Sequence, residues 1–173
     1  MVRIISHQGR QIECHTETTA TLTEDQLSAF VYRSIGPTRQ SGRFVDFAVP
    51  SQQPATYYAA SASGHLWKSE NHGLTWDVLF DNEEVYSIGD IAVAPSNPDI
   101  LYLGSGEANN SRSTYWGDGV YKSTDAGETW TLMGLERTGR IPRIVVDPTN
   151  SDVVLVCALG HAYGPQPERG GSS

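Results

Sequence analysis

Residues 105–118 hold the densest group of side chains in this sequence that could bind or transform a ligand. This polar stretch lies between two apolar runs and contains two acids, two amides, an arginine and a tryptophan: Glu107, Asn109, Asn110, Arg112, Trp116 and Asp118. An aromatic ring can stack on the CH face of a sugar, while amides and carboxylates supply the donors and acceptors that its hydroxyls need. Long loops on a rigid scaffold are also a common place for function. The stretch predicts a site for a carbohydrate, or for a peptide or protein ligand, unless Glu107, Asn109 and Asn110 only cap turns of the loop.

Four carboxylates could take part in the hydrolysis of a glycosidic bond: Asp46, Asp90, Glu107 and Asp118. Such hydrolysis needs two carboxyl groups, roughly 5 to 10 Å apart, on either side of the scissile bond. Asp46 and Asp90 occupy matching places in two similar segments, so we expect them at equivalent positions in the fold. Whether the chain is an enzyme stays open at this point, with Glu107, Asp90 and Asp46 as catalytic candidates.

Three basic side chains are further candidates for ligand binding. Arg43 and Arg140 each follow a glycine at the start of a predicted inner strand, where a guanidinium could hold a carboxylate bidentately. His161 could act as a general base or contact a ligand, or it could simply be hydrogen-bonded. Cys14 and Cys157 lie in different regions, and no spacing of cysteine and histidine is typical of zinc, so we predict no metal site and no cofactor. A disulfide between the two cysteines stays open.

The elements that position these residues are organised by an octapeptide that occurs twice, 54 residues apart, at 69–76 and 123–130. Five places are shared between the copies: Ser69, Asn71, Gly73, Thr75 and Trp76 in the first, and Ser123, Asp125, Gly127, Thr129 and Trp130 in the second. Each copy lies between two β-like runs and therefore predicts a hairpin loop. The Asn or Asp side chain can accept hydrogen bonds from amides ahead of it, and the glycine supplies a positive φ. We predict a structural role, because a calcium loop would need more carboxylates.

The repeat extends beyond the octapeptides. Each unit reads as strand, proline turn, strand, loop, strand, octapeptide and strand, which is one four-stranded propeller blade. We predict an all-β fold, a β-propeller fragment of about two and a half four-stranded antiparallel blades, with blade one at about 43–80, blade two at about 87–134 and a half blade at about 140–160. Residues 1–31 are a polar leader, with or without a short helix at 24–30, and residues 32–173 form the partial propeller.

Propellers close with about four to eight blades. The sequence therefore predicts a fragment of a larger protein, or a truncated reading frame, with open strand edges. Such edges invite pairing with another chain. The expected partners are the remaining blades of a longer chain or a second copy of this one.

The octapeptide resembles the Asp-box, also called the bacterial neuraminidase (BNR) repeat, of sialidases, xyloglucanase-type glycoside hydrolases and sortilin-type receptors. The second copy matches S-x-D-x-G-x-T-W fully, and the first differs at Asn71. Segments 34–37, 104–110, 119–125 and 158–161 are similar to the first blades of large bacterial glycosyl hydrolase-like, or sortilin-N-terminal-like, proteins. The resemblance implies a β-propeller and a secreted or periplasmic protein, with the boxes on the blade rim, away from the ligand face. It leaves activity open, because the superfamily mixes hydrolases with binding modules.

Composition narrows the function classes. The net charge of −8 is a poor electrostatic match for nucleic acid. No apolar run reaches the roughly 18 residues of a membrane helix, and no export signal is recognisable at the N-terminus. The xyloglucanase type has a catalytic Asp shortly after the second strand of its first blade, whereas residues 58–64 here contain no acid. We therefore predict a non-catalytic propeller segment that binds a carbohydrate or a protein or peptide partner. The alternative is a fragment of a glycoside hydrolase, xyloglucanase- or sialidase-like, that is active only in the full-length protein.

Overall fold

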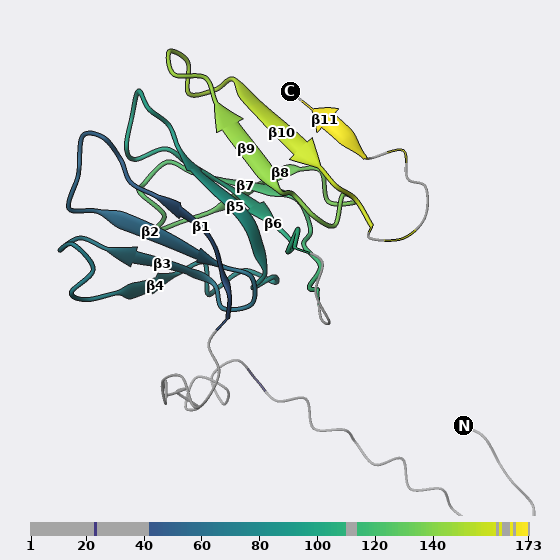
Figure 1. Cartoon of the computed structure of the whole chain (residues 1–173), viewed down its shortest axis with the longest axis horizontal. Helices are drawn as coiled ribbons and strands as arrows, with labels where there is room; N and C mark the ends of the chain where they lie inside the picture. The colour runs from purple at the N-terminus through teal and green to yellow at the C-terminus, as the bar shows by residue number, and fades with distance from the viewer. Residues whose placement is uncertain are drawn as a thin grey trace, which may run out of the picture. The chain divides into compact units, whose positions relative to one another are not determined.

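The computed structural model describes Thr23 and residues 42–109, 114–161, 163, 167 and 169–172. The chain divides into two compact units, Met1–Thr38 and Arg39–Ser173, and every described residue except Thr23 belongs to the second. Within the described residues the structure contains strands and no helix (Figure 1). The prediction of an all-β fold is confirmed. Apart from Thr23, the predicted leader at 1–31 lies outside the described residues.

The strands form three antiparallel sheets, shown side by side in Figure 1. The first sheet consists of β1 (Phe44–Ala48), β2 (Tyr57–Ser61), β3 (Leu66–Ser69) and β4 (Asp77–Leu79). The second consists of β5 (Ile88–Val93), β6 (Leu101–Ser105), β7 (Val120–Ser123) and β8 (Thr131–Gly134). The third consists of β9 (Arg143–Val146), β10 (Val154–Ala158) and β11 (Gly170–Ser172), where β11 adds to the two strands that the sequence predicts there. In each sheet, strands that are consecutive along the chain lie next to each other.

Strand register shows that the three sheets repeat one plan. β1 has an irregularity between Phe44 and Asp46, and β5 has one at the same point, between Ile88 and Asp90. Asp46 and Asp90 therefore occupy equivalent positions, as the sequence predicts. The register of β9 with β10 puts Arg143 at this position in the third sheet.

Each pair of neighbouring sheets encloses an apolar core. The core between the first and second sheets contains Tyr58, Ala60, Leu66, Leu79, Phe80, Ile88, Ile91, Leu101, Leu103 and Tyr121. The core between the second and third contains Ala94, Tyr102, Val120, Ile141, Ile144, Val146 and Val156. The second sheet is thus covered on both faces, and β6 is buried at every position. Burial of this apolar surface holds the sheets together, at about 25 cal/mol per Å².

Both octapeptides form hairpin loops that share two hydrogen bonds from backbone amides to side-chain oxygens. In the second copy, the Ser123 hydroxyl oxygen accepts from the Gly127 amide at 2.8 Å, and Asp125 Oδ1 accepts from the Thr129 amide at 2.9 Å. The first copy repeats both bonds at the same distances. Gly127 has a φ of +93°, which a glycine adopts without strain. In the second copy the tryptophan ring, Trp130, packs edge-on against Phe80, with 5.4 Å between ring centroids.

Asp125 gives a first testable prediction. The hydrogen bond from the Thr129 hydroxyl, with those from the Thr129 amide and the Ser123 hydroxyl, lowers the pKa of Asp125 to about 2. Replacing Asp125 with Ala removes these acceptors, and we expect a loss of about 1 kcal/mol in unfolding free energy at pH 7, like that of a lost capping residue. Asn71→Ala removes the uncharged counterpart and is expected to cost less, because hydrogen bonds to a charged acceptor are stronger. Urea denaturation of both variants measures the difference, and equal losses would contradict the expectation.

Candidate functional site

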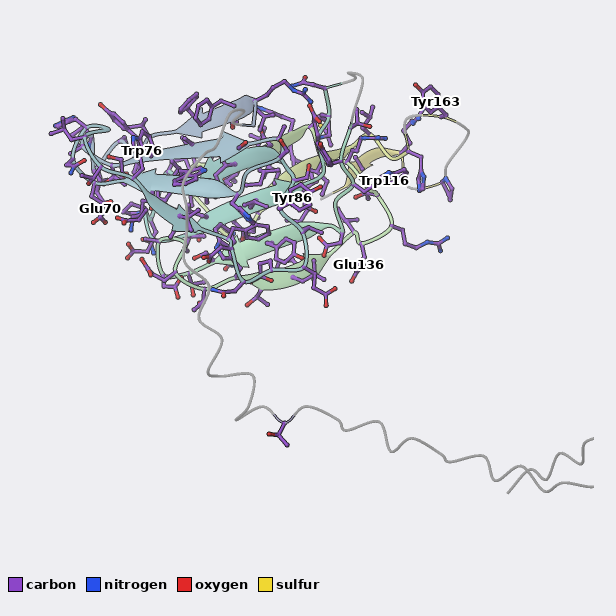
Figure 2. The ribbon with its side chains drawn as sticks, turned by 90° about the horizontal axis from the view of Figure 1, so that it is seen from below. Glu70, Trp76, Tyr86, Trp116, Glu136 and Tyr163 are labelled. Carbon is purple, nitrogen blue, oxygen red and sulfur yellow. The ribbon has the colours of Figure 1, made fainter. Side chains whose placement is uncertain are left out.

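One end of the three sheets carries the loops that the sequence marked as functional. We call it the loop face and define it by the described residues within 62–65, 80–87, 106–119 and 159–169. At this end, an amide just after the second strand of each sheet bonds a carbonyl just before the first strand, as in Gly106 N to Ser87 O at 2.8 Å. The octapeptides lie at the opposite end. Figure 2 shows Trp76 at one end of the strands and Trp116 toward the other.

A series of aromatic rings runs along the loop face. The ring centroids of His65 and Tyr86 are 6.3 Å apart, those of Tyr86 and Tyr115 are 5.5 Å apart, and those of Trp116 and His161 are 4.2 Å apart. We call these five residues the aromatic row. It begins on the first sheet, follows the β6–β7 loop of the second and ends after β10 of the third. The three sheets therefore each contribute ring surface to this end of the molecule.

Trp116 is the most firmly supported member that still faces solvent. Its side chain is 49 % exposed. The guanidinium carbon of Arg140 lies 4.8 Å from its ring centroid, a cation–π contact. A Cβ on Gly139 would lie 2.7 Å from Trp116 Cε3, so the ring packs directly on the backbone there. Trp116 is therefore held in place from behind while part of its surface stays free.

Arg140 supports the Trp116 ring, and its guanidinium is occupied by other contacts. It is buried. Its Nη2 donates to Thr114 Oγ1 at 2.6 Å, and its Nη1 donates to the Gly160 carbonyl at 3.5 Å. The predicted role of Arg140 as a carboxylate-binding group would compete with these contacts. His161 is the residue after Gly160, and its carbonyl accepts a hydrogen bond from Arg169 Nη2 at 2.8 Å.

Glu107 and Arg43 form an ion pair between the first two sheets. Arg43 Nε donates to Glu107 Oε1 at 3.1 Å, and Nη2 contacts the same oxygen. Glu107 is fully buried, and its other oxygen, Oε2, has no hydrogen-bond partner. Arg43 is about half exposed. Because a buried charge is costly unless paired, the arginine is what makes the carboxylate tolerable at this position.

Asp46 and Asp90 link each sheet to the next one. Asp46 Oδ2 accepts from the Ile91 amide at 3.4 Å, and Asp90 Oδ2 accepts from the Ile144 amide at 2.6 Å. Arg143 Nη1 lies 3.6 Å from Asp90 Oδ1. Burial, together with the nearby Asp46 carboxylate, raises the pKa of Asp90 to about 7, against the hydrogen bond from the Ile144 amide. These two candidates therefore lie near each other on the first strands of their sheets, with Asp90 buried and Asp46 half-buried, and not on the loop face.

The remaining candidates are placed as follows. Asp118 accepts hydrogen bonds from the Ser105 hydroxyl at 3.1 Å and from the Tyr121 hydroxyl at 2.6 Å, which closes the base of the β6–β7 loop. Burial, with this bond to Asp118, raises the pKa of Tyr121. Asn109 is exposed. Asn110, Arg112 and Cys14 lie outside the described residues.

The sequence interpretation named Trp116 and His161 of the row as candidates, included Tyr115 only as part of the stretch 105–118, and missed Tyr86 and His65. Tyr86 lies at the end of the β4–β5 connection and His65 lies just before β3, and neither belongs to a motif. One signal in the sequence pointed to Tyr86. It directly precedes Ser87, and Ser87 has in the second sheet the position that the candidates Arg43 and Arg140 have in the other two.

Among the described residues no group of three His, Cys, Asp or Glu side chains could hold a metal ion. In that same part of the chain no helix is long and apolar enough to span a membrane.

No family model matches this sequence. The chain is similar to a xyloglucanase of a Paenibacillus species, with 28% identity over 134 residues, covering 67% of this chain and 12% of that protein. It is also similar to xyloglucanase Xgh74A of Acetivibrio thermocellus, with 26% identity over 112 residues, covering 57% and 13%. The chain thus spans about an eighth of the length of these curated relatives.

The chain also superposes on solved structures. An ancestral GH74 enzyme superposes with a TM-score of 0.55 at 21% identity, over 68% of this chain and 14% of that one. The GH74 xyloglucanase from Xanthomonas campestris superposes with a TM-score of 0.51 at 22% identity, over 68% and 18%. These are β-propeller enzymes. The fold is that of a β-propeller fragment. The predicted fold class is confirmed, and so is the predicted resemblance at the level of xyloglucanases.

Proposed function

We propose that this chain is a non-catalytic propeller segment that binds a glucan along its aromatic row. The observation that carries the proposal is Trp116, half exposed and fixed from behind by Arg140 and Gly139. A ring that is already immobilised loses little entropy when a sugar stacks on it, and preorganisation of this kind favours affinity. The similarity to xyloglucanases supports a glucan, and xyloglucan in particular, over a peptide ligand.

The row suits a polymer better than a single sugar. Its rings come from three successive sheets, so a chain of sugar units could contact several of them at once. Each further contact is then made within an already bound molecule, and weak single contacts add up to useful affinity. Thr114 and exposed Asn109 lie in the β6–β7 loop that carries Trp116 and could pair with the hydroxyls.

Burial of Glu107 and Asp90 argues against catalysis by these two carboxylates. A glycosidase carboxylate must reach the scissile bond, yet Glu107 is fully buried and Asp90 is nearly so. Asp90 also has both oxygens engaged, by the Ile144 amide and the Arg143 guanidinium. We further interpret the octapeptides as Asp-boxes that keep the sheets rigid at the end away from the ligand.

The experiment is a titration of the chain with xyloglucan by calorimetry. We expect binding, and we expect Trp116→Ala to weaken it about tenfold or more, which is about 1.4 kcal/mol. Trp76→Ala is the matched control, because Trp76 is also partly exposed, at 38 %, but lies at the opposite end of the strands. Equal losses in both variants, or none in either, would contradict a binding site at Trp116.

A glycoside hydrolase is the second candidate function. It is favoured by the raised pKa of Asp90 next to Asp46, because general acids in glycosidases have raised pKa values. A search for reducing ends released from xyloglucan separates the two functions. Hydrolysis that Glu107→Gln or Asp90→Asn abolishes, with folding intact, would show the hydrolase and overturn the non-catalytic proposal.

A further inference from the structure

His65 has a backbone conformation that glycine provides in the neighbouring sheet. Its φ of +64° lies in the left-handed region, which a residue with a Cβ enters only at a cost in free energy. His65 directly precedes β3 and Gly119 directly precedes β7, and the strand registers make the two residues equivalent. Gly119 also has a positive φ, of +131°. The fold therefore accepts glycine at this position, and the imidazole of His65 needs an explanation of its own.

The imidazole of His65 is fixed in one tautomer. Its Nδ1 lies 3.0 Å from the carbonyl oxygen of Phe80. Because a carbonyl oxygen only accepts hydrogen bonds, Nδ1 carries the hydrogen of the neutral ring and Nε2 carries a lone pair. Among the described residues no hydrogen bond reaches Nε2. The side chain therefore presents a hydrogen-bond acceptor whose direction is set by the bond at the other ring nitrogen.

The bond to the Phe80 carbonyl does not by itself account for a histidine. Phe80 follows β4 with a φ of +61°, and Leu135 follows β8 in the same conformation, with a φ of +64°. The Leu135 carbonyl accepts hydrogen bonds from the amide of Thr138 at 3.0 Å and from its hydroxyl at 2.8 Å. The second sheet thus satisfies the equivalent carbonyl within one turn of chain, without an imidazole. What His65 adds in the first sheet is a second ring nitrogen.

The ring of His65 lies at the first-sheet end of the aromatic row. Its backbone amide donates to the Tyr86 carbonyl at 3.2 Å, and the two rings meet edge to face with 6.3 Å between their centroids. Tyr86 is 43% exposed, and His65 is partly exposed. An acceptor therefore lies beside an exposed flat ring. Sugar sites combine these two features, because the ring contacts the CH groups of the sugar while the acceptor takes a hydroxyl.

The loop that carries His65 is anchored on both sides of this residue. Trp67 Nε1 donates to the Gly64 carbonyl at 2.7 Å, and the Ser61 amide donates to the His65 carbonyl at 3.1 Å. Together with the bond to Phe80, these contacts hold the backbone and the ring in place before a ligand arrives. Because preorganised groups lose little entropy on binding, an acceptor held in this way contributes more of its hydrogen-bond energy to affinity.

We propose that His65 Nε2 accepts a hydrogen bond from a hydroxyl of the sugar unit that stacks on Tyr86, which makes His65 a specificity-determining residue of the row. This inference rests on the proposed function, because it needs a glucan on the aromatic row. The indole nitrogen of Trp116 can only donate hydrogen bonds, whereas Nε2 of this tautomer can only accept. A ligand that covers His65 without offering a hydroxyl leaves the acceptor without a partner, which costs binding free energy. The row therefore selects a sugar with a hydroxyl at this point over one with an apolar group there.

Nitrogen-15 NMR of the full chain at pH 8 tests the tautomer without any ligand. An imidazole nitrogen that carries no proton resonates far downfield of one that does, so the spectrum identifies the acceptor directly. The chain has five histidines, and the signals lost in His65→Asn assign those of His65. We expect a protonated Nδ1 and an unprotonated Nε2, with an upfield shift of Nε2 when xyloglucan is added. A proton on Nε2 in the free chain would overturn the proposal.

Calorimetry with xyloglucan tests the role in binding. His65→Asn keeps an amide that can donate to the Phe80 carbonyl and tolerates the left-handed backbone, but it is too short to place an acceptor where Nε2 lies. We expect binding about fivefold weaker than that of the wild type, the effect of one hydrogen bond, with an unchanged melting temperature. His72→Asn is the matched control and should bind like the wild type. His72 also has a positive φ, of +57°, and engages its Nδ1 with the Tyr57 hydroxyl at 3.3 Å, but it lies in the first octapeptide at the opposite end.

The outcomes separate this inference from the function on which it rests. Binding that Trp116→Ala weakens and His65→Asn does not would overturn the role of His65 and leave the glucan site standing. Equal losses in His65→Asn and His72→Asn would also overturn it, because the effect would then be a general one. The Nε2 shift is measured on the wild type and decides the question if the variant loses stability, since saturation with xyloglucan without a shift would exclude the hydrogen bond. A wild-type chain that does not bind xyloglucan would overturn both proposals.

Discussion

Replacing Gly106 with Ala should lower the unfolding free energy by about 3 kcal/mol or more, the range seen when a buried backbone contact cannot relax. Gly106 has a φ of +86°, which strains any residue with a Cβ. An added Cβ would lie 2.1 Å from the Gly139 carbonyl oxygen and 2.7 Å from the Gly117 nitrogen. Both are backbone atoms, so relief requires the backbone itself to move. Urea denaturation of the variant measures the loss.

Gly134 supplies the matched control for this prediction. It also has a positive φ, of +126°, but an added Cβ would have no heavy atom within 4 Å. Gly134→Ala should therefore show the conformational strain alone, about 1 kcal/mol. Gly106→Ala should in addition weaken xyloglucan binding, because Gly139 supports the Trp116 ring. Equal destabilisation of the two variants would show that steric contact contributes nothing.

Asp90→Asn should stabilise the protein at pH 8, by about 2 kcal/mol, and leave it almost unchanged at pH 4. Burial raises the pKa of Asp90 from its ordinary value of 3.8 to about 7. Since the folded state then binds more protons than the unfolded state, stability is fully present below about pH 4 and is lost as the pH rises through about 7. Each pKa unit corresponds to about 1.4 kcal/mol, and relaxation of the pair of Asp90 and Asp46 reduces the full effect to about 2 kcal/mol. The asparagine stays neutral, and its carbonyl oxygen can still accept from the Ile144 amide.

Thermal denaturation from pH 4 to pH 8 measures this effect as the difference between variant and wild type. Asp81→Asn is the control, because Asp81 is an exposed carboxylate and surface replacements of this kind change stability little. A difference for Asp90→Asn that does not grow with pH would mean that Asp90 is charged in the folded state across this range. Destabilisation at every pH would mean that its attraction to Arg143 outweighs the cost of burial.

The repeat made most of the fold predictable. Ser123, Asp125, Gly127 and Thr129 make their hydrogen bonds within eight residues, so local sequence specifies the hairpin. The proline turns and β-rich runs fix the strand order in the same local way. β11 was not predicted, because its pairing with β10 depends on residues distant in sequence and it has no octapeptide to mark it.

The candidate site was predictable only as a list of residue types. Glu107 and Asp118 are polar residues in a long loop, and nothing in the sequence distinguishes a ligand-binding acid from a structural one. The structure assigns Glu107 to an ion pair with Arg43, 64 positions away, and Asp118 to hydrogen bonds with Ser105 and Tyr121. Such pairings follow from strand register and sheet stacking, which the residue pattern does not encode directly.

The sequence by itself determined an all-β chain of repeated four-stranded units, because turn chemistry and strand alternation act over a few residues at a time. Only the tertiary structure decided which side chains face solvent and which face a neighbouring sheet. Asp90 and Trp116 illustrate the division. Asp90 is buried against the third sheet, and the half-exposed ring of Trp116 is supported by Arg140, which lies just before the first strand of that sheet. The physical reason is that burial and electrostatic pairing depend on distances between segments far apart in the chain, and those distances exist only once the sheets have packed.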